Sequence, residues 1–385
     1  GMKVFLVAGE PSGDKLGAAL MAGLKRLRAG VIFQGVGGPL MQEQGLVSQF
    51  PMDELSVMGL AEVLPKYRHL KRRIREVADE VIAAQPDVLI TIDSPDFCLR
   101  VARLVKAASD TRTVHYVAPT VWAWRPKRAL KMARVIDHVL ALFPFEPPLM
   151  QAAGMACDFV GHPVVAEPVA TPDEIADFRA RHALGNGPLI LALPGSRRGE
   201  VSRLAPRFGA ALAAVLKAQP DARVVLPCAA PVESLVRALT ADWPVQPILI
   251  AAADRAGKRA AFAAADVALA ASGTVSLELA AVGTPMVIAY DMNWLSRILI
   301  ARMLLVDTVT LVNLVSETRS VPEFIGQDCQ PAPIGAALLD VLAQPEAQNA
   351  AMALTMQRLG QGGEEPGLRA ARAVLDGLGE SNART

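Results

Sequence analysis

Two carboxylates that lie close together in the chain are the first residues whose placement suggests chemistry. Asp93 and Asp96 follow the apolar, mostly β-branched run 88–92 in the stretch VLITIDSPDF. A carboxylate at the end of a buried strand can act as a general base towards a hydroxyl group. An acidic residue in this place can also cap the helix that follows. We expect one aspartate to do chemistry and the other to be structural.

A second set of residues suits the binding of phosphate groups. In LPGSRRGEV (193–201) the guanidinium of Arg197 follows two small residues, and its planar shape matches phosphate oxygens. ASGTVSLELA (271–280) opens a predicted helix, whose first N–H groups favour an anion, and Glu278 can accept hydrogen bonds from a ribose. The alternatives are solvated surface arginines and a solvated glutamate. The expected binding residues are Ser196, Arg197, Ser272, Gly273, Thr274 and Glu278.

Two further turns and one asparagine complete the candidate binding residues. AGEPSGD (8–14) follows an apolar run, and its small residues allow a ligand to approach closely. The alternative is an ordinary strand-to-helix turn with Ser12 or Asp14 as its cap. We expect Glu10, Ser12, Gly13 and Asn313 to contact substrate. GVGGPLM (35–41) lacks the acidic residue after a strand that a dinucleotide site needs, so we reject nicotinamide binding.

Residues 55–76 combine apolar side chains with a dense group of basic ones. Such a mixture suits contact with a membrane surface. The alternative is a helix that packs on its domain and leaves its basic face in solvent. The expected membrane contacts are Val57, Met58, Leu60, Val63, Leu64, Arg68 and Arg72.

Short apolar runs alternate with amphipathic helical stretches along the whole chain. Strands are expected at residues 3–8, 31–36, 87–92, 113–117, 138–142, 189–193, 223–227, 247–250, 266–270 and 285–290. Continuous apolar strands between helices indicate parallel sheets that helices cover on both faces. The chain is therefore expected to be α/β, with doubly wound domains at 1–165 and 166–345 and a helical tail at 346–385 that packs back on a domain.

The composition excludes several classes of protein. The net charge of +1 gives no indication of nucleic-acid binding. The four cysteines are far apart, which predicts neither a zinc site nor a disulfide framework. We see no run of about 18 apolar residues that would span a membrane, and no secretory signal, so the expected location is cytoplasmic.

Taken together, the motifs resemble one known family, lipid-A-disaccharide synthase. The resemblance runs over about residues 3–325 and is carried in order by AGEPSGD, GVGG, LSVMGLAEVLP, IDSPDF, HYVAPTVWAWRPKR, FPFE, FVGHP, LPGSR, SGTVSLELA and VGTPMV. VAPTVWAWRPKR and LSVMGLAEVLP are long and specific, and the resemblance weakens in the tail.

The resemblance implies an inverting glycosyltransferase with two Rossmann-like domains facing across a cleft, the GT-B arrangement. The implied reaction joins UDP-2,3-diacylglucosamine to 2,3-diacylglucosamine 1-phosphate at the cytoplasmic face of the inner membrane. It needs no metal and no cofactor. The position of the Pro-Asp-Phe sequence points to Asp96 over Asp93 as the base, while Glu278 would hold the ribose. The resemblance leaves open whether the protein forms a homo-oligomer.

Three other functions remain compatible with these residues. A UDP-sugar 2-epimerase would share the fold and the nucleotide site but would need no lipid surface. A membrane-associated transferase that acts on a lipid-linked sugar would differ in its acceptor. A two-domain sugar- or nucleotide-binding protein would use the cleft without chemistry, which the presence of Asp96, Arg197 and Glu278 disfavours.

Overall fold

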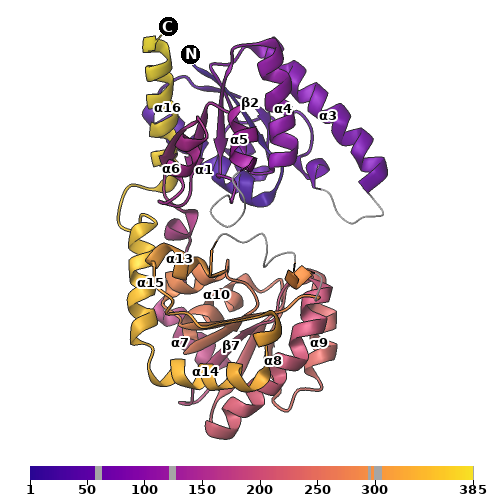
Figure 1. Cartoon of the computed structure of the whole chain (residues 1–385), viewed down its shortest axis with the longest axis vertical. Coiled ribbons are helices and arrows are strands. Elements are labelled where there is room, and N and C mark those ends of the chain that lie inside the picture. The colour runs from indigo at the N-terminus through magenta and orange to yellow at the C-terminus, as the bar shows by residue number, and fades with distance from the viewer. Residues whose placement is uncertain (57–62, 121–126, 294–295, 299–305, 385) are drawn as a thin grey trace. The chain divides into compact units, whose positions relative to one another are not determined.

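The computed structural model divides the chain into two compact units (Figure 1). The first unit contains Gly1–Ala166 and Leu359–Thr385, and the second contains Glu167–Arg358. The structure describes residues 1–56, 63–120, 127–293, 296–298 and 306–384; for 63–65 and 380–384 it describes the backbone alone. The chain therefore crosses between the units twice.

The first unit is built on a parallel sheet with the strand order β2-β1-β3-β4-β5-β6. Its strands are β1 (Lys3–Ala8), β2 (Ile32–Val36), β3 (Val88–Ile92), β4 (Arg112–Tyr116), β5 (His138–Ala141) and β6 (Ala156–Phe159). All five residues of β3 are buried. A central strand of a parallel sheet is covered on both faces, which explains why β3 is apolar without alternation.

Helices cover this first sheet, and the last one comes from the end of the chain. They are α1 (Pro11–Leu27), α2 (Pro39–Glu43), α3 (Val63–Ala84), α4 (Pro95–Ala108), α5 (Lys127–Ala133), α6 (Pro147–Ala152) and α16 (Pro366–Arg384), with 3-10 turns η1 (Met52–Leu55) and η3 (Pro163–Ala166). A Cβ atom on Gly23 of α1 would lie 2.8 Å from the carbonyl oxygen of Gly367 in α16. Glycine thus allows these helices to pack backbone to backbone, side by side in Figure 1.

The second unit has the strand order β12-β11-β10-β7-β8-β9, again all parallel. Its strands are β7 (Leu189–Leu193), β8 (Arg223–Pro227), β9 (Ile248–Ile250), β10 (Val267–Ala270), β11 (Met286–Tyr290) and β12 (Glu323–Ile325). Its helices are α7 (Pro172–Arg181), α8 (Arg198–Ala218), α9 (Glu233–Thr240), α10 (Arg255–Ala264), α11 (Ser276–Val282), α13 (Leu311–Ser316), α14 (Pro331–Ala343) and α15 (Glu346–Arg358), with 3-10 turns η4 (Ala230–Val232) and η5 (Gly326–Asp328).

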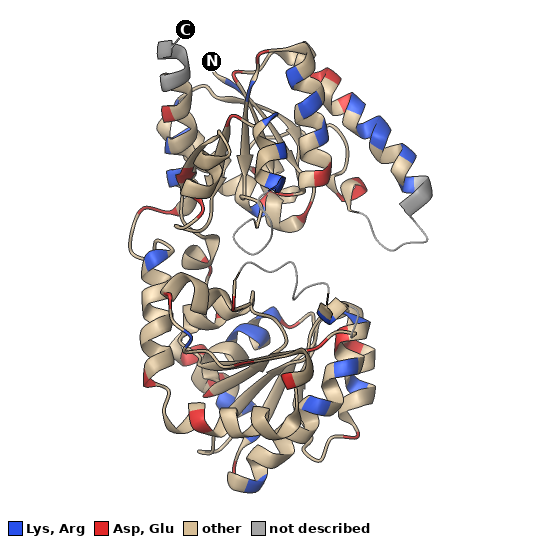
Figure 2. Cartoon of the chain, viewed as in Figure 1, with Lys and Arg blue, Asp and Glu red and all other residues tan. Residues whose placement is uncertain are grey.

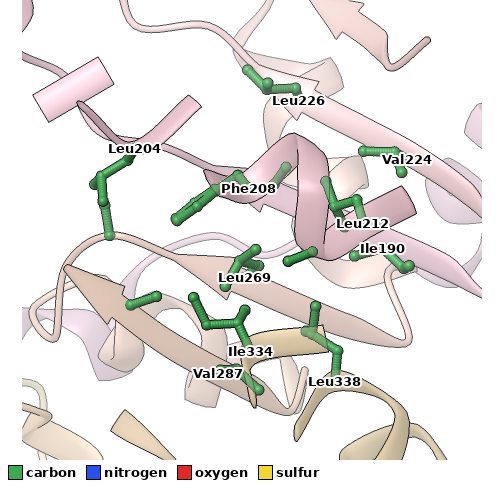
Figure 3. Close-up of a cluster of buried hydrophobic side chains, with 14 of the residues drawn as sticks. Ile190, Leu204, Phe208, Leu212, Val224, Leu226, Leu269, Val287, Ile334 and Leu338 are labelled. Carbon is green, nitrogen blue, oxygen red and sulfur yellow. The ribbon is translucent and has the colours of Figure 1, made fainter. Parts of the chain in front are cut away.

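The core of the second unit lies between its sheet and helices α8 and α14. Figure 3 shows Phe208 and Leu212 of α8 and Leu338 of α14 near Leu269 of β10. All four side chains are fully buried. Burying large apolar side chains is the main source of folding free energy, so this core fixes the strand ends that carry the candidate site.

The predicted α/β class with two doubly wound domains is confirmed. The ten expected strand segments all occur, with ends shifted by one residue or less. The sequence reading missed β6 and β12, which are edge strands. Two of the four residues of β6 are exposed, and β12 has only three residues, so neither gives a long apolar run. Among the described helices, none is long and apolar enough to cross a membrane.

Candidate active site

In the first unit, the candidate residues gather where the chain changes direction across the sheet. β1 lies between β2 and β3, and the later strands continue beyond β3. In doubly wound folds ligands bind outside the carboxyl ends of strands at such a switch point. A Cβ atom on Gly9, after β1, would lie 3.0 Å from Oγ of Ser94, after β3. The structure thus brings the AGEPSGD and DSPDF motifs together.

Asp93 occupies a strained position at the end of β3. Its φ is +50°, and the φ of the next residue, Ser94, is +41°. Residues other than glycine in the left-handed region cost about 1–3 kcal/mol each and cluster at functional sites. Burial raises the pKa of the Asp93 carboxyl, and a hydrogen bond from the backbone of Ser94 opposes this effect. Asp93 is therefore a half-buried carboxylate with increased basicity.

Asp96 has a different environment. It lies in the first turn of α4 and is exposed to solvent. A negative charge in the first turn interacts favourably with the helix dipole, which is a structural role. The family resemblance points to Asp96 as the base, but the structure gives strain and burial to Asp93 and solvent exposure to Asp96.

The turn after β1 divides into exposed and buried residues. Glu10 and Ser12 are exposed at the start of α1, and Gly13 is buried. A Cβ atom on Gly13 would lie 3.5 Å from the carbonyl oxygen of Ile92, which is an ordinary van der Waals contact, so Gly13 packs against β3. Glu10 and Ser12 are thus accessible to a ligand, while Gly13 is buried against β3.

Asp14 has a structural role that the sequence did not reveal. Its carboxylate accepts backbone N–H groups of Gly38 at 3.0 Å, Met41 at 3.0 Å and Leu40 at 3.1 Å. These N–H groups lie at the beginning of α2, so Asp14 caps α2 rather than its own helix. This interaction joins the AGEPSGD and GVGGPLM turns. Sequence spacing gives no signal for a cap that comes from a distant element.

Two histidines of the first unit, His115 and His162, are weak bases. Nδ1 of His115 lies 2.7 Å from Oγ1 of Thr91, and burial lowers the pKa of His115 to about 4. Nδ1 of His162 accepts the N–H of Val164 at 3.0 Å, and burial lowers its pKa to about 4 as well. Both rings are neutral at pH 7. They add no positive charge to the unit.

In the second unit, the candidate phosphate-binding motifs also meet at a switch point. β7 pairs with β10 so that Leu193 lies opposite Ala270, and the LPGSRRGEV and ASGTVSLELA motifs follow these strand ends. The structure places Arg197 just before α8, with an exposed side chain. The two motifs therefore meet at one edge of the sheet, where doubly wound folds bind their ligands.

The backbone of the Gly-Ser-Arg turn is already bonded within the protein. Gly195 has a φ of +115°, which favours glycine. Oε1 of Glu200 accepts the N–H groups of Ser196 and Arg197, each at 3.3 Å. Because Glu200 occupies these two backbone donors, an anion at this turn would depend on side chains such as the exposed guanidinium of Arg197.

The Ser-Gly-Thr turn is closely packed from one side. Oγ of Ser272 lies 2.6 Å from Oγ1 of Thr274 and accepts the backbone N–H of Thr274 at 3.2 Å. A Cβ atom on Gly273 would lie 1.9 Å from the carbonyl oxygen of Val309. No larger residue fits at Gly273 without movement of the backbone at Val309.

The two remaining candidates of the second unit differ sharply in exposure. Glu278 is exposed on α11, and Nζ of Lys258 lies 4.0 Å from its carboxylate. Asn313 is buried, and its amide exchanges hydrogen bonds with both backbone groups of Val321 and donates to Oγ1 of Thr308 at 3.2 Å. Glu278 is accessible to a ligand beside Lys258, whereas the Asn313 amide is used within the protein.

The predicted membrane segment is described only in part. Val57, Met58 and Leu60 lie outside the described residues, and so do the side chains of Val63 and Leu64. Figure 2 shows basic residues along α3. Arg68 and Arg72 are exposed there. Arg73 instead pairs with Glu54 at 2.8 Å and stacks on the ring of Phe50. Arg68 and Arg72 of α3 therefore point to solvent, whereas Arg73 packs against its own unit.

Comparison with known proteins identifies the family. A family model described as lipid-A-disaccharide synthetase matches residues 4–374. The lipid-A-disaccharide synthase of Ruegeria pomeroyi is 66% identical over 383 residues, which are 98% of this chain and 96% of that relative. The enzyme of the same name from Rhodospirillum centenum is 47% identical over 380 residues, covering 97% and 94%.

Solved structures add evidence on the fold. UDP-GlcNAc 2-epimerase from Neisseria meningitidis, bound to UDP-GlcNAc, has a TM-score of 0.63 and 12% sequence identity, and the match covers 98% of this chain and 100% of that one. At this identity the likeness concerns the fold alone, so the function rests on the sequence relatives. This chain belongs to the lipid-A-disaccharide synthetase family and is a glycosyltransferase of lipid A biosynthesis.

Proposed function

We propose that this chain transfers 2,3-diacylglucosamine from UDP-2,3-diacylglucosamine to 2,3-diacylglucosamine 1-phosphate. The products are UDP and the β-1,6-linked lipid A disaccharide 1-phosphate, formed with inversion at the anomeric carbon. The observation that carries this proposal is the family match over residues 4–374, together with relatives of that name over nearly the full chain.

The second unit binds the UDP part of the donor. Its switch point carries Arg197, which is exposed after the end of β7, and the Ser272–Thr274 turn, which follows the end of the neighbouring β10. A fixed positive charge stabilises the negative charge that develops on the departing UDP. Glu278 accepts hydrogen bonds from the ribose hydroxyl groups. The epimerase with bound UDP-GlcNAc supports this assignment because its whole chain shares the fold.

The first unit binds the acceptor, and Asp93 acts as the general base. Asp93 removes the proton from the 6-hydroxyl as its oxygen attacks the anomeric carbon, and the bond from that carbon to the UDP oxygen breaks. A basic carboxylate suits proton removal better than an ordinary one. Burial gives Asp93 this property, whereas Asp96 is exposed. Glu10 and Ser12 contact a sugar at the same switch point.

The protein works on the cytoplasmic face of the inner membrane, as a peripheral protein. Both substrates carry acyl chains and are held in the bilayer, so the active site has to approach its surface. The exposed basic residues of α3, including Arg68 and Arg72, support this proposal because anionic lipids attract basic side chains.

One assay tests the proposed reaction. Purified protein is mixed with both substrates in detergent micelles with EDTA, and UDP and the disaccharide are followed by mass. The proposal predicts both products in equal amounts. UDP without disaccharide would indicate hydrolysis or an epimerase-like reaction. UDP binding without turnover would indicate another lipid acceptor or a binding protein.

A further inference from the structure

One carboxylate of the second unit, Glu323 on β12, has no role in the reaction described above. It lies beside a backbone segment, Thr308–Thr310, that covers the Ser272–Thr274 turn. The carbonyl oxygen of Val309 would be 1.9 Å from a Cβ atom on Gly273. The backbone N–H of Leu311 also donates to the carbonyl oxygen of Gly273 at 3.3 Å. The position of the turn therefore depends on the position of this segment.

Glu323 holds the segment through a dense set of hydrogen bonds. Oγ1 of Thr308 donates to the carboxylate and lies 2.9 Å from Oε1 and 2.6 Å from Oε2 of Glu323. The backbone N–H of Val309 lies 3.1 Å from both oxygens, and Oγ1 of Thr310 donates at 3.0 Å. Both threonines are buried. One side chain thus fixes three consecutive residues.

The chemistry of these bonds calls for a carboxylate. An ionised carboxylate only accepts hydrogen bonds, and all the groups that face it here are donors. Glutamine would replace one carboxylate oxygen by an NH₂ group. This donor would then face the hydroxyl and N–H donors of the Thr308–Thr310 segment. The N–H of Val309 is fixed by the backbone and cannot turn away, so the segment would have to move.

We infer that Glu323 is a positioning residue for the donor, because it sets the Thr308–Thr310 segment against Gly273 and so fixes the Ser272–Thr274 turn. This inference rests on the proposed binding of the UDP group at that turn. Glu323 does not touch the reacting atoms. Its loss is expected to weaken UDP binding and to leave the handling of the acceptor unchanged.

The test compares Glu323→Gln with wild type for UDP affinity by calorimetry and for the KM of each substrate. We expect UDP affinity to fall about tenfold, which corresponds to about 1.4 kcal/mol. The KM of the donor is expected to rise similarly, while kcat and the KM of the acceptor stay within about threefold. Glu317→Gln is the matched control, because Glu317 is an exposed carboxylate of the same unit that pairs with Arg358 on α15.

A second pair of variants keeps the test valid if Glu323→Gln does not fold. Thr308→Val removes, at nearly constant shape, the hydroxyl that donates to Glu323 and accepts from the Asn313 amide, and Thr308→Ser keeps it. The inference predicts weaker UDP binding in the valine variant and rescue by serine. Wild-type UDP affinity in Glu323→Gln, or equal UDP affinity in both Thr308 variants, would overturn the inference alone. Failure of wild type to bind UDP would overturn the proposed function and this inference with it.

Discussion

At the scale of single residues, Asp93 combines three properties that structural carboxylates rarely share. It has a positive φ, it is partly buried, and burial raises its pKa. Each property lowers the stability of the folded protein. A residue that costs stability in this way is expected where it contributes to catalysis. Two predictions follow from the raised pKa.

The raised pKa of Asp93 predicts how the stability of the folded protein depends on pH. Because the pKa of Asp93 is higher in the folded than in the unfolded chain, its ionisation reduces stability as pH rises from the unfolded value of about 3.9 through the folded value. Above the folded pKa the full cost is present. Asp93→Asn is therefore expected to have a Tm equal to or above that of wild type at pH 7. A Tm several degrees lower would contradict the burial argument.

The raised pKa of Asp93 also predicts how turnover depends on pH. Asp93 has to be ionised to accept a proton, so kcat should fall as pH decreases through its raised pKa. The acid limb is expected above the ordinary aspartate value of about 3.9. Asp96→Asn serves as the control and should leave this limb in place. A limb that moved in Asp96→Asn would assign the titration to Asp96.

At the scale of elements, long-range side-chain contacts join the turns that carry the site. Asp14 on α1 caps α2, and Glu323 on β12 holds the segment before α13. Neither contact follows from local sequence periodicity. Each one connects a strand-end turn to an element far away in the chain, which restricts movement of the turn.

Asp14→Ala is expected to reduce the free energy of unfolding by about 2–3 kcal/mol, because three backbone N–H groups would lose their acceptor and two of them belong to buried residues. Urea denaturation measures this change. Asp110→Ala is the control, because Asp110 is an exposed aspartate of the same unit. A loss no larger than that of the control would show that Asp14 does not anchor α2.

At the scale of the whole molecule, the sequence predicts the architecture better than the site. Apolar runs such as 88–92 and 189–193 specify central strands directly, because burial on both faces leaves no alternation. The sequence also places the Asp93 and Arg197 motifs at strand ends. It does not reveal that Glu200 occupies the N–H groups beside Arg197 or that the Asn313 amide is bonded internally, since both depend on tertiary packing.

The membrane proposal also belongs to this scale. Replacing Arg68 and Arg72 with Gln removes two exposed charges from α3. Each basic residue near an anionic surface contributes about 1 kcal/mol, so we expect partition onto vesicles with anionic lipid to fall about tenfold or more. Lys217→Gln with Arg181→Gln removes two exposed charges from the second unit and is the matched control. Equal vesicle sedimentation of both double variants would argue against α3 as the contact.

The most direct test of the mechanism is the rate of disaccharide formation by Asp93→Asn and Asp96→Asn at saturating substrate. General-base catalysis contributes about 10²–10⁴-fold. We predict a loss of this size in Asp93→Asn, with UDP affinity within a few-fold of wild type, and most of the activity retained in Asp96→Asn. Normal turnover by Asp93→Asn, or a comparable loss in Asp96→Asn alone, would contradict the assignment of Asp93 as the base.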